Sequence, residues 1–232
     1  MNQDSFDILV LGGGHAGCEA ALAAARMGKS VGLVTLKKDA IGRMSCNPAI
    51  GGLAKGHLVR EIDALGGEMA KVTDQTAIQF RMLNTTKGPA VWAPRAQCDK
   101  YHYQRSMQSV VENQLGVTVI EEMAIELLAS NNVIAGIRTQ NGLVFKSKAV
   151  VITTGTFLNG LMHTGEKTSQ GGRVGEQAAV GLTDSLVSLG FLVGRLKTGT
   201  PPRLDKDSID FNQTFQQLGT PNPNPFLMKM IR

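Results

Sequence analysis

The sequence is poor in cysteine, histidine and aromatic residues, and each shortage excludes a kind of protein. Its 232 residues include three cysteines, four histidines and one tryptophan. An odd number of cysteines without a C-x-x-C pair argues against a disulfide scaffold and a zinc site. A flavin-dependent disulfide reductase would need a C-x-x-x-x-C or similar redox pair, which the sequence lacks. The histidines have no metal-ligand spacing with acidic or cysteine partners, so no metal site is expected.

Long apolar runs and targeting signals are absent as well. No apolar stretch approaches the length of a membrane span, and residues 1–5 lack the basic and apolar regions of a signal peptide. We therefore expect a soluble, cytoplasmic protein that has no membrane partner. A hydrophobic content of 42% excludes wholesale disorder, and the net charge of +5 permits contact with nucleic acid without requiring it.

The sequence does contain a glycine-rich turn near its beginning, between an apolar segment (residues 6–11) and an alanine-rich segment that ends at Gly28. The turn fits G-x-G-x-x-G, in which the glycines allow a tight turn, approach of the backbone to a pyrophosphate, and close packing of helix on strand. No Gly-Lys-Ser/Thr follows, which excludes a P-loop. A helix that begins here directs free N–H groups at the phosphates. The residues predicted to bind a dinucleotide are Gly12, Gly13, Gly14, His15, Ala16 and Gly17.

The second apolar strand, residues 30–36, lacks the acidic residue that usually bonds the adenosine ribose at its end. Thr35 stands in that place. Its hydroxyl can bond a ribose hydroxyl, but without the assistance of a charge. Tight binding of NAD is therefore doubtful, and both NAD and FAD stay open on these residues alone.

The next part of the chain is predicted to alternate between loops and helices. Residues 41–52 are predicted to form a glycine-rich loop, and the helix after it should end at Gly66. A glycine and two prolines interrupt residues 85–95, which indicates a loop. Asp99 is predicted to cap a helix that runs to Leu115.

Short strands dominate the sequence after Gly116. The predicted meander comprises residues 117–122, 124–129, 133–139 and 143–148, and an apolar strand over residues 149–153 follows it. That strand ends in Thr154 and Gly155. By analogy of fold, this is the organisation of FAD domains of the glutathione-reductase type. Such domains have a parallel β-α-β start, then a helix, a meander and a strand that ends in Thr-Gly.

We therefore predict an α/β fold with two parts. Residues 1–200 should form a Rossmann-like FAD-binding domain that lacks its C-terminal segment, with a β-meander inserted. Proline and asparagine accumulate near Pro201. Residues 201–232 are accordingly predicted to begin a second, inserted domain that is truncated.

Cys46 is the side chain with the greatest potential for chemistry. It lies in the glycine-bounded loop, and the N-terminus of a following helix, together with Arg43, would lower the pKa of its thiol. A small buried cysteine in a loop that packs on a cofactor explains the pattern equally well. Cys18 lies on the first predicted helix, where it is expected to fill the core.

Three basic residues, Lys87, Arg95 and Arg173, adjoin glycine or proline in predicted loops. Loops over a cofactor crevice are where substrate phosphates or a nucleic-acid backbone are bound. Solvated surface charge is the default interpretation of any one of these residues.

The segment from Met44 to Gly52, MSCNPAIGG, resembles the glucose-inhibited division protein A family, whose members are tRNA uridine 5-carboxymethylaminomethyl modification enzymes. The resemblance covers essentially the whole chain. It continues through residues 12–17, 55–59, 63–67, 87–91, 95–97, 154–158, 171–173 and 195–203.

The resemblance implies an enzyme that binds FAD, takes reducing power from NADH and works with a GTPase partner. Such enzymes modify carbon 5 of the wobble uridine of tRNA and look like homodimers. The cysteine that matches Cys46 is one of two that the family needs; it either adds to carbon 6 of the uracil or assists protonation. The resemblance also implies that Gly12 to Gly17 contact FAD, that the backbone of Ala124 meets its adenine, and that Thr154 and Gly155 lie beside it. Lys87, Arg95 and Arg173 are the candidates for tRNA contact.

Family members are more than twice as long as this chain, and they carry the second cysteine and most of the NADH site further along. We therefore expect an N-terminal portion of such an enzyme. One alternative is a folate- and FAD-dependent tRNA uracil-5 methyltransferase. That enzyme should have a glutamate after its second strand and no Ser-Cys-Asn-Pro loop, unlike the sequence around Thr35 and Cys46. Another alternative is a non-catalytic fragment that binds FAD or tRNA.

Overall fold

The computed structural model describes residues 4–199, 202, 204–221 and 226. The chain divides into two compact units. The first comprises residues 1–43 and 103–194, and the second comprises residues 44–102 and 195–232. Among the described residues, no helix is long and apolar enough to cross a membrane.

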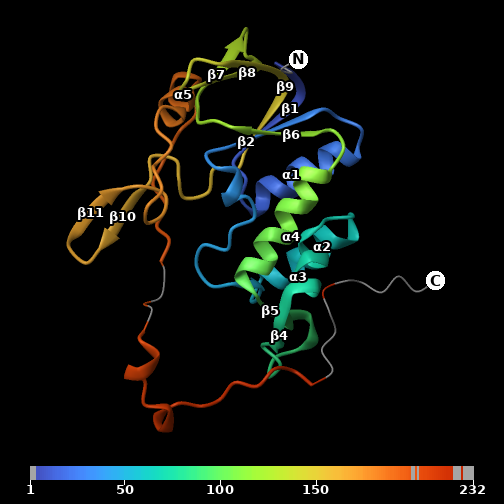
Figure 1. Ribbon diagram of the computed structural model, residues 1–232, viewed down its shortest axis with the longest axis vertical. Coiled ribbons are helices and arrows are strands. Elements are labelled where there is room, and N and C mark those ends of the chain that lie inside the picture. The colour runs from blue at the N-terminus through green and yellow to red at the C-terminus, as the bar shows by residue number, and fades with distance from the viewer. Residues whose placement is uncertain (1–3, 200–201, 203, 222–225, 227–232) are drawn as a thin grey trace. The chain divides into compact units, whose positions relative to one another are not determined.

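The first unit is built on a six-stranded sheet in the order β6-β2-β1-β9-β8-β7 (Figure 1). Strands β6, β2, β1 and β9 are parallel, and β9, β8 and β7 form an antiparallel meander. The strand bounds are β1 (Ser5–Leu11), β2 (Val31–Thr35), β6 (Val117–Glu121), β7 (Ala124–Ser130), β8 (Val133–Thr139) and β9 (Val144–Ile152). Since Leu11 pairs with both Val34 and Ile152, the carboxyl ends of the parallel strands meet at one edge. The predicted α/β, Rossmann-like fold with a meander is confirmed.

Helices complete the first unit. Helix α1 contacts β1, β2, β6 and β9, and α5 packs on β7 (Figure 1). The remaining elements include a hairpin of strands β10 and β11. Their bounds are α1 (His15–Arg26), η1 (Lys38–Ala40), α4 (Lys100–Asn113, which belongs to this unit from Tyr103), β10 (Leu161–Thr164), β11 (Lys167–Gln170) and α5 (Leu182–Ser188). The small buried residues Cys18, Ala21 and Ala25 let α1 approach the sheet closely.

Both faces of β1 are buried, as expected for a central strand of a parallel sheet. Leu9 and Leu11 belong to one apolar cluster with Phe145 and Leu182. Val10 points to the opposite face, and its side chain is also fully buried. Each such side chain stabilises the fold by about 1.5–3 kcal/mol. This packing fixes the end of β1, from which the glycine-rich turn begins.

The second unit contains a three-stranded antiparallel sheet in the order β3-β5-β4. Phe226 is buried against Phe80, and its backbone N–H donates to Asp74 Oδ1 at 2.9 Å. The elements are β3 (Ala49–Gly51), α2 (Lys55–Ala64), α3 (Met69–Thr76), β4 (Ala77–Leu83), η2 (Pro89–Val91), β5 (Ala93–Cys98), η3 (Lys206–Ser208) and η4 (Phe211–Gln213).

Several predicted elements are confirmed. Helix α2 ends just before Gly66, and α4 begins directly after Asp99. The Asp99 carboxylate accepts the backbone N–H groups of Tyr101 and His102 at 3.0 and 2.8 Å, which is the predicted cap.

Other predictions are wrong in part. Residues 93–95 are not loop but the start of β5, and residues 49–51, predicted as loop, form β3. Pro94 is tolerated because β3 pairs only with residues 95–97, so that the missing N–H removes no bond to β3.

The predicted division of the meander into strands is also wrong. The predicted strands 143–148 and 149–153 are the single strand β9, and β6 pairs with β2 in parallel instead of joining the meander. Helix α3 and strand β4 were not predicted. The predicted extents of the FAD-binding domain (1–200) and of the inserted domain (201–232) stay predictions, and the boundary at Pro201 lies outside the described residues.

Candidate functional site

The glycine-rich turn lies at the carboxyl end of β1 and is held tightly against β9. Gly12 has a φ of +108°, and a Cβ at this position would lie 2.5 Å from the carbonyl oxygen of Thr153. A Cβ at Gly17 would overlap the carbonyl oxygen of Gly12. The Thr153 hydroxyl donates to the carbonyls of Leu11 and Gly12 at 2.9 and 3.0 Å. Glycine is therefore required at positions 12 and 17 to let α1 cross the ends of these strands.

Gly14 differs from these two glycines because it faces open space. A Cβ at Gly14 would meet no described atom within 4 Å, and no described side chain caps α1, of which Gly14 is the N-cap. Residues His15, Ala16 and Gly17 form the first turn of the helix behind it. Uncapped N–H groups and the positive end of the helix dipole suit an oxyanion. The turn therefore fits the pyrophosphate of a dinucleotide.

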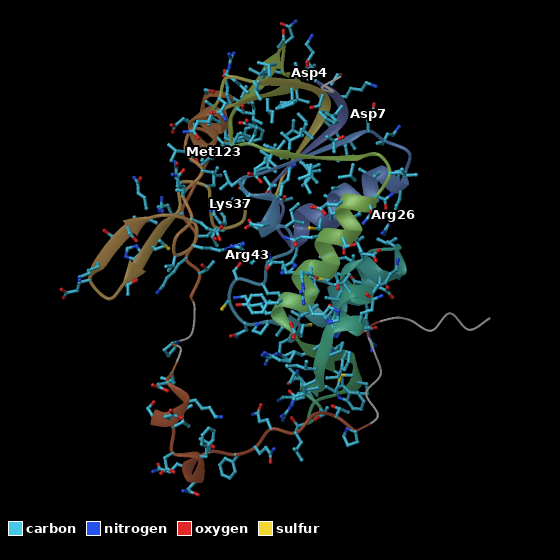
Figure 2. All side chains as sticks on the ribbon, viewed as in Figure 1. Asp4, Asp7, Arg26, Lys37, Arg43 and Met123 are labelled. Carbon is cyan, nitrogen blue, oxygen red and sulfur yellow. The ribbon has the colours of Figure 1, made fainter. Side chains whose placement is uncertain are left out.

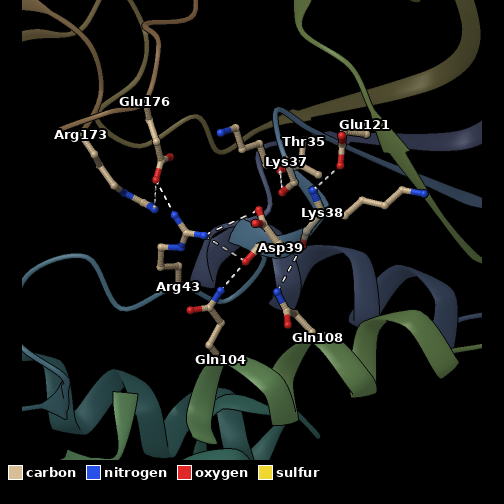
Figure 3. Close-up of polar contacts among 10 residues, drawn as sticks. All are labelled: Thr35, Lys37, Lys38, Asp39, Arg43, Gln104, Gln108, Glu121, Arg173 and Glu176. Carbon is tan, nitrogen blue, oxygen red and sulfur yellow. Dashed lines mark hydrogen bonds and ion pairs between the residues drawn. The ribbon is translucent and has the colours of Figure 1, made fainter. Parts of the chain in front are cut away.

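Thr35 lies beside the turn, as its place in the sequence predicted. It is buried, and a Cβ at Gly13 would lie 3.0 Å from its hydroxyl oxygen. The next strand supplies an acidic side chain that the sequence had not suggested. Glu121 pairs with Thr35 across the sheet, and its carboxylate accepts the backbone N–H of Lys38 at 2.7 Å (Figure 3). This edge thus carries a carboxylate from β6, which is bonded to the loop that follows β2.

The other predicted cofactor residues of the first unit lie at the same edge. Ala124 is buried at the start of β7, shortly after β6 ends, and the backbone N–H of Glu122 donates to the carbonyl of Thr35 at 3.0 Å. Thr154 and Gly155 lie just beyond β9, which ends at Ile152. The structure therefore brings the glycine turn, Thr35, Ala124, Thr154 and Gly155 to the carboxyl ends of the parallel strands.

His15 is the one titratable side chain within the turn. The Tyr103 hydroxyl lies 3.5 Å from its Nδ1, and the two rings meet edge to face at 5.5 Å. Burial lowers the pKa of His15, and the positive charge of Arg173 lowers it further. The imidazole therefore stays neutral to lower pH than an exposed histidine, which leaves the oxyanion site without a charge from this residue.

Arg173 lies in the first unit, in an ion-pair cluster. Its Nη1 is 3.6 Å from Glu176 Oε1, and Arg43 Nη1 lies 2.6 Å from the same oxygen (Figure 3). Arg43 and Lys37 lie at the opposite end of the sheet from Asp7 (Figure 2). Sequence analysis assigned Arg43 to the Cys46 thiol, whereas the structure pairs it with Glu176.

Cys46 belongs to the second unit and is half-buried. Strand β3 follows it, and α2 begins only at Lys55, so that the expected helix N-terminus directly after Cys46 is wrong. Burial raises the pKa of the other two thiols, to about 12 for Cys18 and about 11 for Cys98. Core filling by Cys18 is therefore confirmed, whereas the catalytic role of Cys46 stays a prediction.

Lys87 and Arg95 also belong to the second unit, on separate elements. Lys87 is exposed, and its carbonyl accepts Trp92 Nε1–H at 2.9 Å. Arg95 lies on β5, directly opposite Arg81 of β4. Sequence analysis had not singled out Arg81. Two like charges opposite each other destabilise a sheet, so this face suits an anionic partner.

Among the described residues, no group of three or more histidine, cysteine, aspartate or glutamate side chains is arranged to hold a metal ion.

Known proteins match this chain closely. The family described as "Glucose inhibited division protein A" matches residues 7–230. The tRNA uridine 5-carboxymethylaminomethyl modification enzyme MnmG of Protochlamydia amoebophila is 56% identical over 216 residues, which is 93% of this chain and 35% of the relative. The enzyme of the same name from Aquifex aeolicus is 56% identical over 209 residues, which is 90% of this chain and 34% of the relative.

Solved structures agree. The structure of Aquifex aeolicus GidA in its form II crystal has a TM-score of 0.91 and 54% identity, and the match covers 96% of this chain and 37% of that chain. The GidA-related protein from Thermus thermophilus, with a TM-score of 0.59 and 22% identity over 81% of this chain and 69% of that one, shares the fold. The chain spans about a third of the length of the curated relatives that it matches. Because the match extends over residues 7–230 and more than half of the aligned residues are identical, the chain belongs to the glucose inhibited division protein A family.

Proposed function

We propose that this chain is the FAD-binding part of an enzyme that adds a carboxymethylaminomethyl group to carbon 5 of the wobble uridine of tRNA. The observation that carries the proposal is the glycine turn, with open space over Gly14 at the uncapped start of α1, in a chain that is 56% identical to enzymes named for this modification. When bound, FAD would supply the redox chemistry.

Different residues of the first unit would bind different parts of FAD. The backbone N–H groups at the start of α1 would hold the pyrophosphate. The Thr35 hydroxyl would face the ribose, and the Ala124 backbone would meet the adenine. Thr154 and Gly155, which follow β9, would border the rest of the cofactor. NAD would lack its usual carboxylate on β2, and this favours FAD at the turn.

Cys46 is the proposed catalytic residue of the second unit. Its thiolate would either add to carbon 6 of the uracil, which activates carbon 5, or assist protonation. The strongly raised pKa values of Cys18 and Cys98 make those two thiols poor nucleophiles. Cys46 is therefore the best candidate among the three cysteines of the chain.

The proposed RNA contacts lie on the second unit as well. Arg95 and Arg81, opposite each other on β5 and β4, would bind backbone phosphates, and the exposed Lys87 would add a further contact. Arg173 was predicted to bind tRNA too. Its position in the cluster beside the glycine turn supports a different ligand.

The remaining parts of the proposal concern partners and location. We infer NADH as the reductant, a GTPase as the protein partner, a homodimer as the assembled form and the cytoplasm as the location. Each follows from the resemblance to the family.

The proposal is tested in cells that lack the gene for this chain. Mass spectrometry of their tRNA nucleosides should show loss of carboxymethylaminomethyl uridine at the wobble position, and the intact gene should restore it. The purified protein should show the absorption spectrum of a bound flavin. Unchanged tRNA modification in the deletion strain would contradict the proposal.

A further inference from the structure

Two arginines of the first unit share one carboxylate oxygen. Arg43 Nη1 lies 2.6 Å from Glu176 Oε1, and Arg173 Nη1 lies 3.6 Å from the same atom (Figure 3). All three side chains are largely buried, with exposed fractions of 28%, 22% and 13% for Arg43, Arg173 and Glu176. One buried carboxylate thus faces two guanidinium groups.

Arg173 has hydrogen-bonding capacity that the described residues do not use. Its Nε and Nη1 atoms are buried and have no hydrogen-bond acceptor within the described part of the chain. The guanidinium lies 5.1 Å above the centre of the Phe157 ring, which holds it in place. Burial lowers the pKa of Arg173, and Glu176 opposes that shift only in part. A buried guanidinium with unused donors indicates that an oxyanion is the missing partner.

Arg43 is held rigidly by the loop around it (Figure 3). Its Nη2 donates to the carbonyl of Asp39 at 3.2 Å, and Gln104 donates to the same carbonyl. Gln108 donates to the carbonyl of Lys38 at 3.3 Å. Arg43 therefore has a hydrogen bond to the loop in addition to its bond to Glu176. The Asp39 carboxylate, 3.7 Å from Arg43 Nη2 and mostly exposed, is a second and weaker counter-ion.

The cluster is attached to the glycine turn. The backbone N–H of Gly42 donates to the carbonyl of Gly13 at 2.9 Å, directly before Arg43 in the chain. Arg173 is close enough to His15, in the turn itself, for its charge to lower the pKa of that imidazole. The arginines and the start of α1 therefore contribute positive potential to one place.

We propose that Arg43 and Arg173 form a phosphate-binding pair for the pyrophosphate of FAD, and that Glu176 occupies this pair until the ligand displaces it. The inference rests on the proposed function, because it names the ligand of the same turn. A pyrophosphate offers more charge and more acceptor oxygens than one carboxylate, so it satisfies both guanidinium groups at once. An RNA phosphodiester has related chemistry, but attachment to the glycine turn favours the cofactor.

The direction in which one substitution changes FAD affinity tests the proposed pair. Glu176→Gln removes the competing charge, and calorimetric titration should show FAD affinity rising about fivefold, because the binding-competent form is no longer blocked. Arg173→Ala should lower FAD affinity about tenfold or more. Arg173→Lys keeps the charge, so its FAD affinity should lie between those of Arg173→Ala and the unmodified protein. Riboflavin lacks phosphate, so its affinity should not change.

Glu126→Gln is the matched control, since Glu126 pairs with Arg138 at 2.7 Å on β7 and β8 of the same unit. It should leave FAD affinity unchanged. The proposal would be overturned if Glu176→Gln bound FAD with an affinity equal to or lower than that of the unmodified protein. It would also be overturned if the substitutions changed riboflavin affinity as much as FAD affinity, or if they changed only the binding of RNA. If the unmodified protein binds no FAD, the proposed function fails instead. Titration with inorganic pyrophosphate then tests the pair alone: tighter binding by Glu176→Gln supports it, and no change contradicts it.

Discussion

The two units of this chain arrange their candidate residues differently. In the first unit, the glycine turn, Thr35, Ala124, Thr154 and Gly155 meet where parallel strands end. In the second unit, Cys46 precedes a short strand and Lys87 lies in a turn. Parallel strands bring distant loops to one edge, whereas an antiparallel sheet spreads polar residues over a face. The first unit is therefore suited to enclose a small cofactor, and the second to contact an extended polymer.

The largest expected effect comes from Cys46, and it should separate catalysis from cofactor binding. Cys46→Ser should reduce wobble-uridine modification about a thousandfold or more, as removal of a nucleophile does. FAD affinity should not change, because serine replaces only the sulfur atom by oxygen and keeps the shape of the side chain. Mass spectrometry of tRNA nucleosides measures the first effect and flavin titration the second. Cys98→Ser is the control. Normal modification in Cys46→Ser would remove Cys46 from the mechanism.

Gly17→Ala should break the first unit. The new Cβ overlaps the carbonyl oxygen of Gly12, so we expect a loss of about 2–4 kcal/mol in unfolding free energy by denaturant titration. Gly28→Ala makes the same change at a position where no described atom lies within 4 Å of the new Cβ. Strain at the positive φ of Gly28 should cost only about 1 kcal/mol. Equal losses in the two variants would show that close packing at Gly17 is unimportant.

Arg95→Ala should weaken RNA binding by the second unit roughly three- to tenfold, and it should reduce the salt dependence by about one phosphate contact. Arg81→Ala should do the same and also raise the melting temperature, because it removes a like charge opposite Arg95. Filter binding at several salt concentrations measures both variants. Salt dependence that stays unchanged in both would contradict the proposed contacts.

The smallest effect should come from Asp7, at the far end of the first sheet. A backbone bond from Ser30, a bond from Lys148 and a hydroxyl bond from Ser30 lower the pKa of this carboxyl to about 2. Its stabilising contribution is therefore present above the unfolded pKa near 4 and is lost as the pH falls toward 2. Melting curves should show Asp7→Asn less stable at pH 7, with the difference disappearing near pH 2. A difference at pH 2 as large as that at pH 7 would refute this assignment.

Sequence patterns predicted the local features of both units. The glycine turn of the first unit and the Asp99 cap of the second are local, and both are found where expected. The environment of Cys46 was predicted wrongly because β3 forms by pairing with β5, more than forty residues further along. The bond between Arg43 and Glu176 joins residues 133 positions apart, and the pairing of Thr35 with Glu121 depends on sheet register. No local pattern contains such information.

The most direct test of the central claim compares Gly14→Val with the unmodified protein in FAD titrations. The claim is that open space over Gly14 is kept for the cofactor pyrophosphate. The new side chain enters space that is free of described atoms, so the melting temperature should change little. FAD affinity should fall at least about tenfold, because the side chain fills the place of the phosphates. Undiminished FAD affinity in a folded Gly14→Val protein would contradict the account.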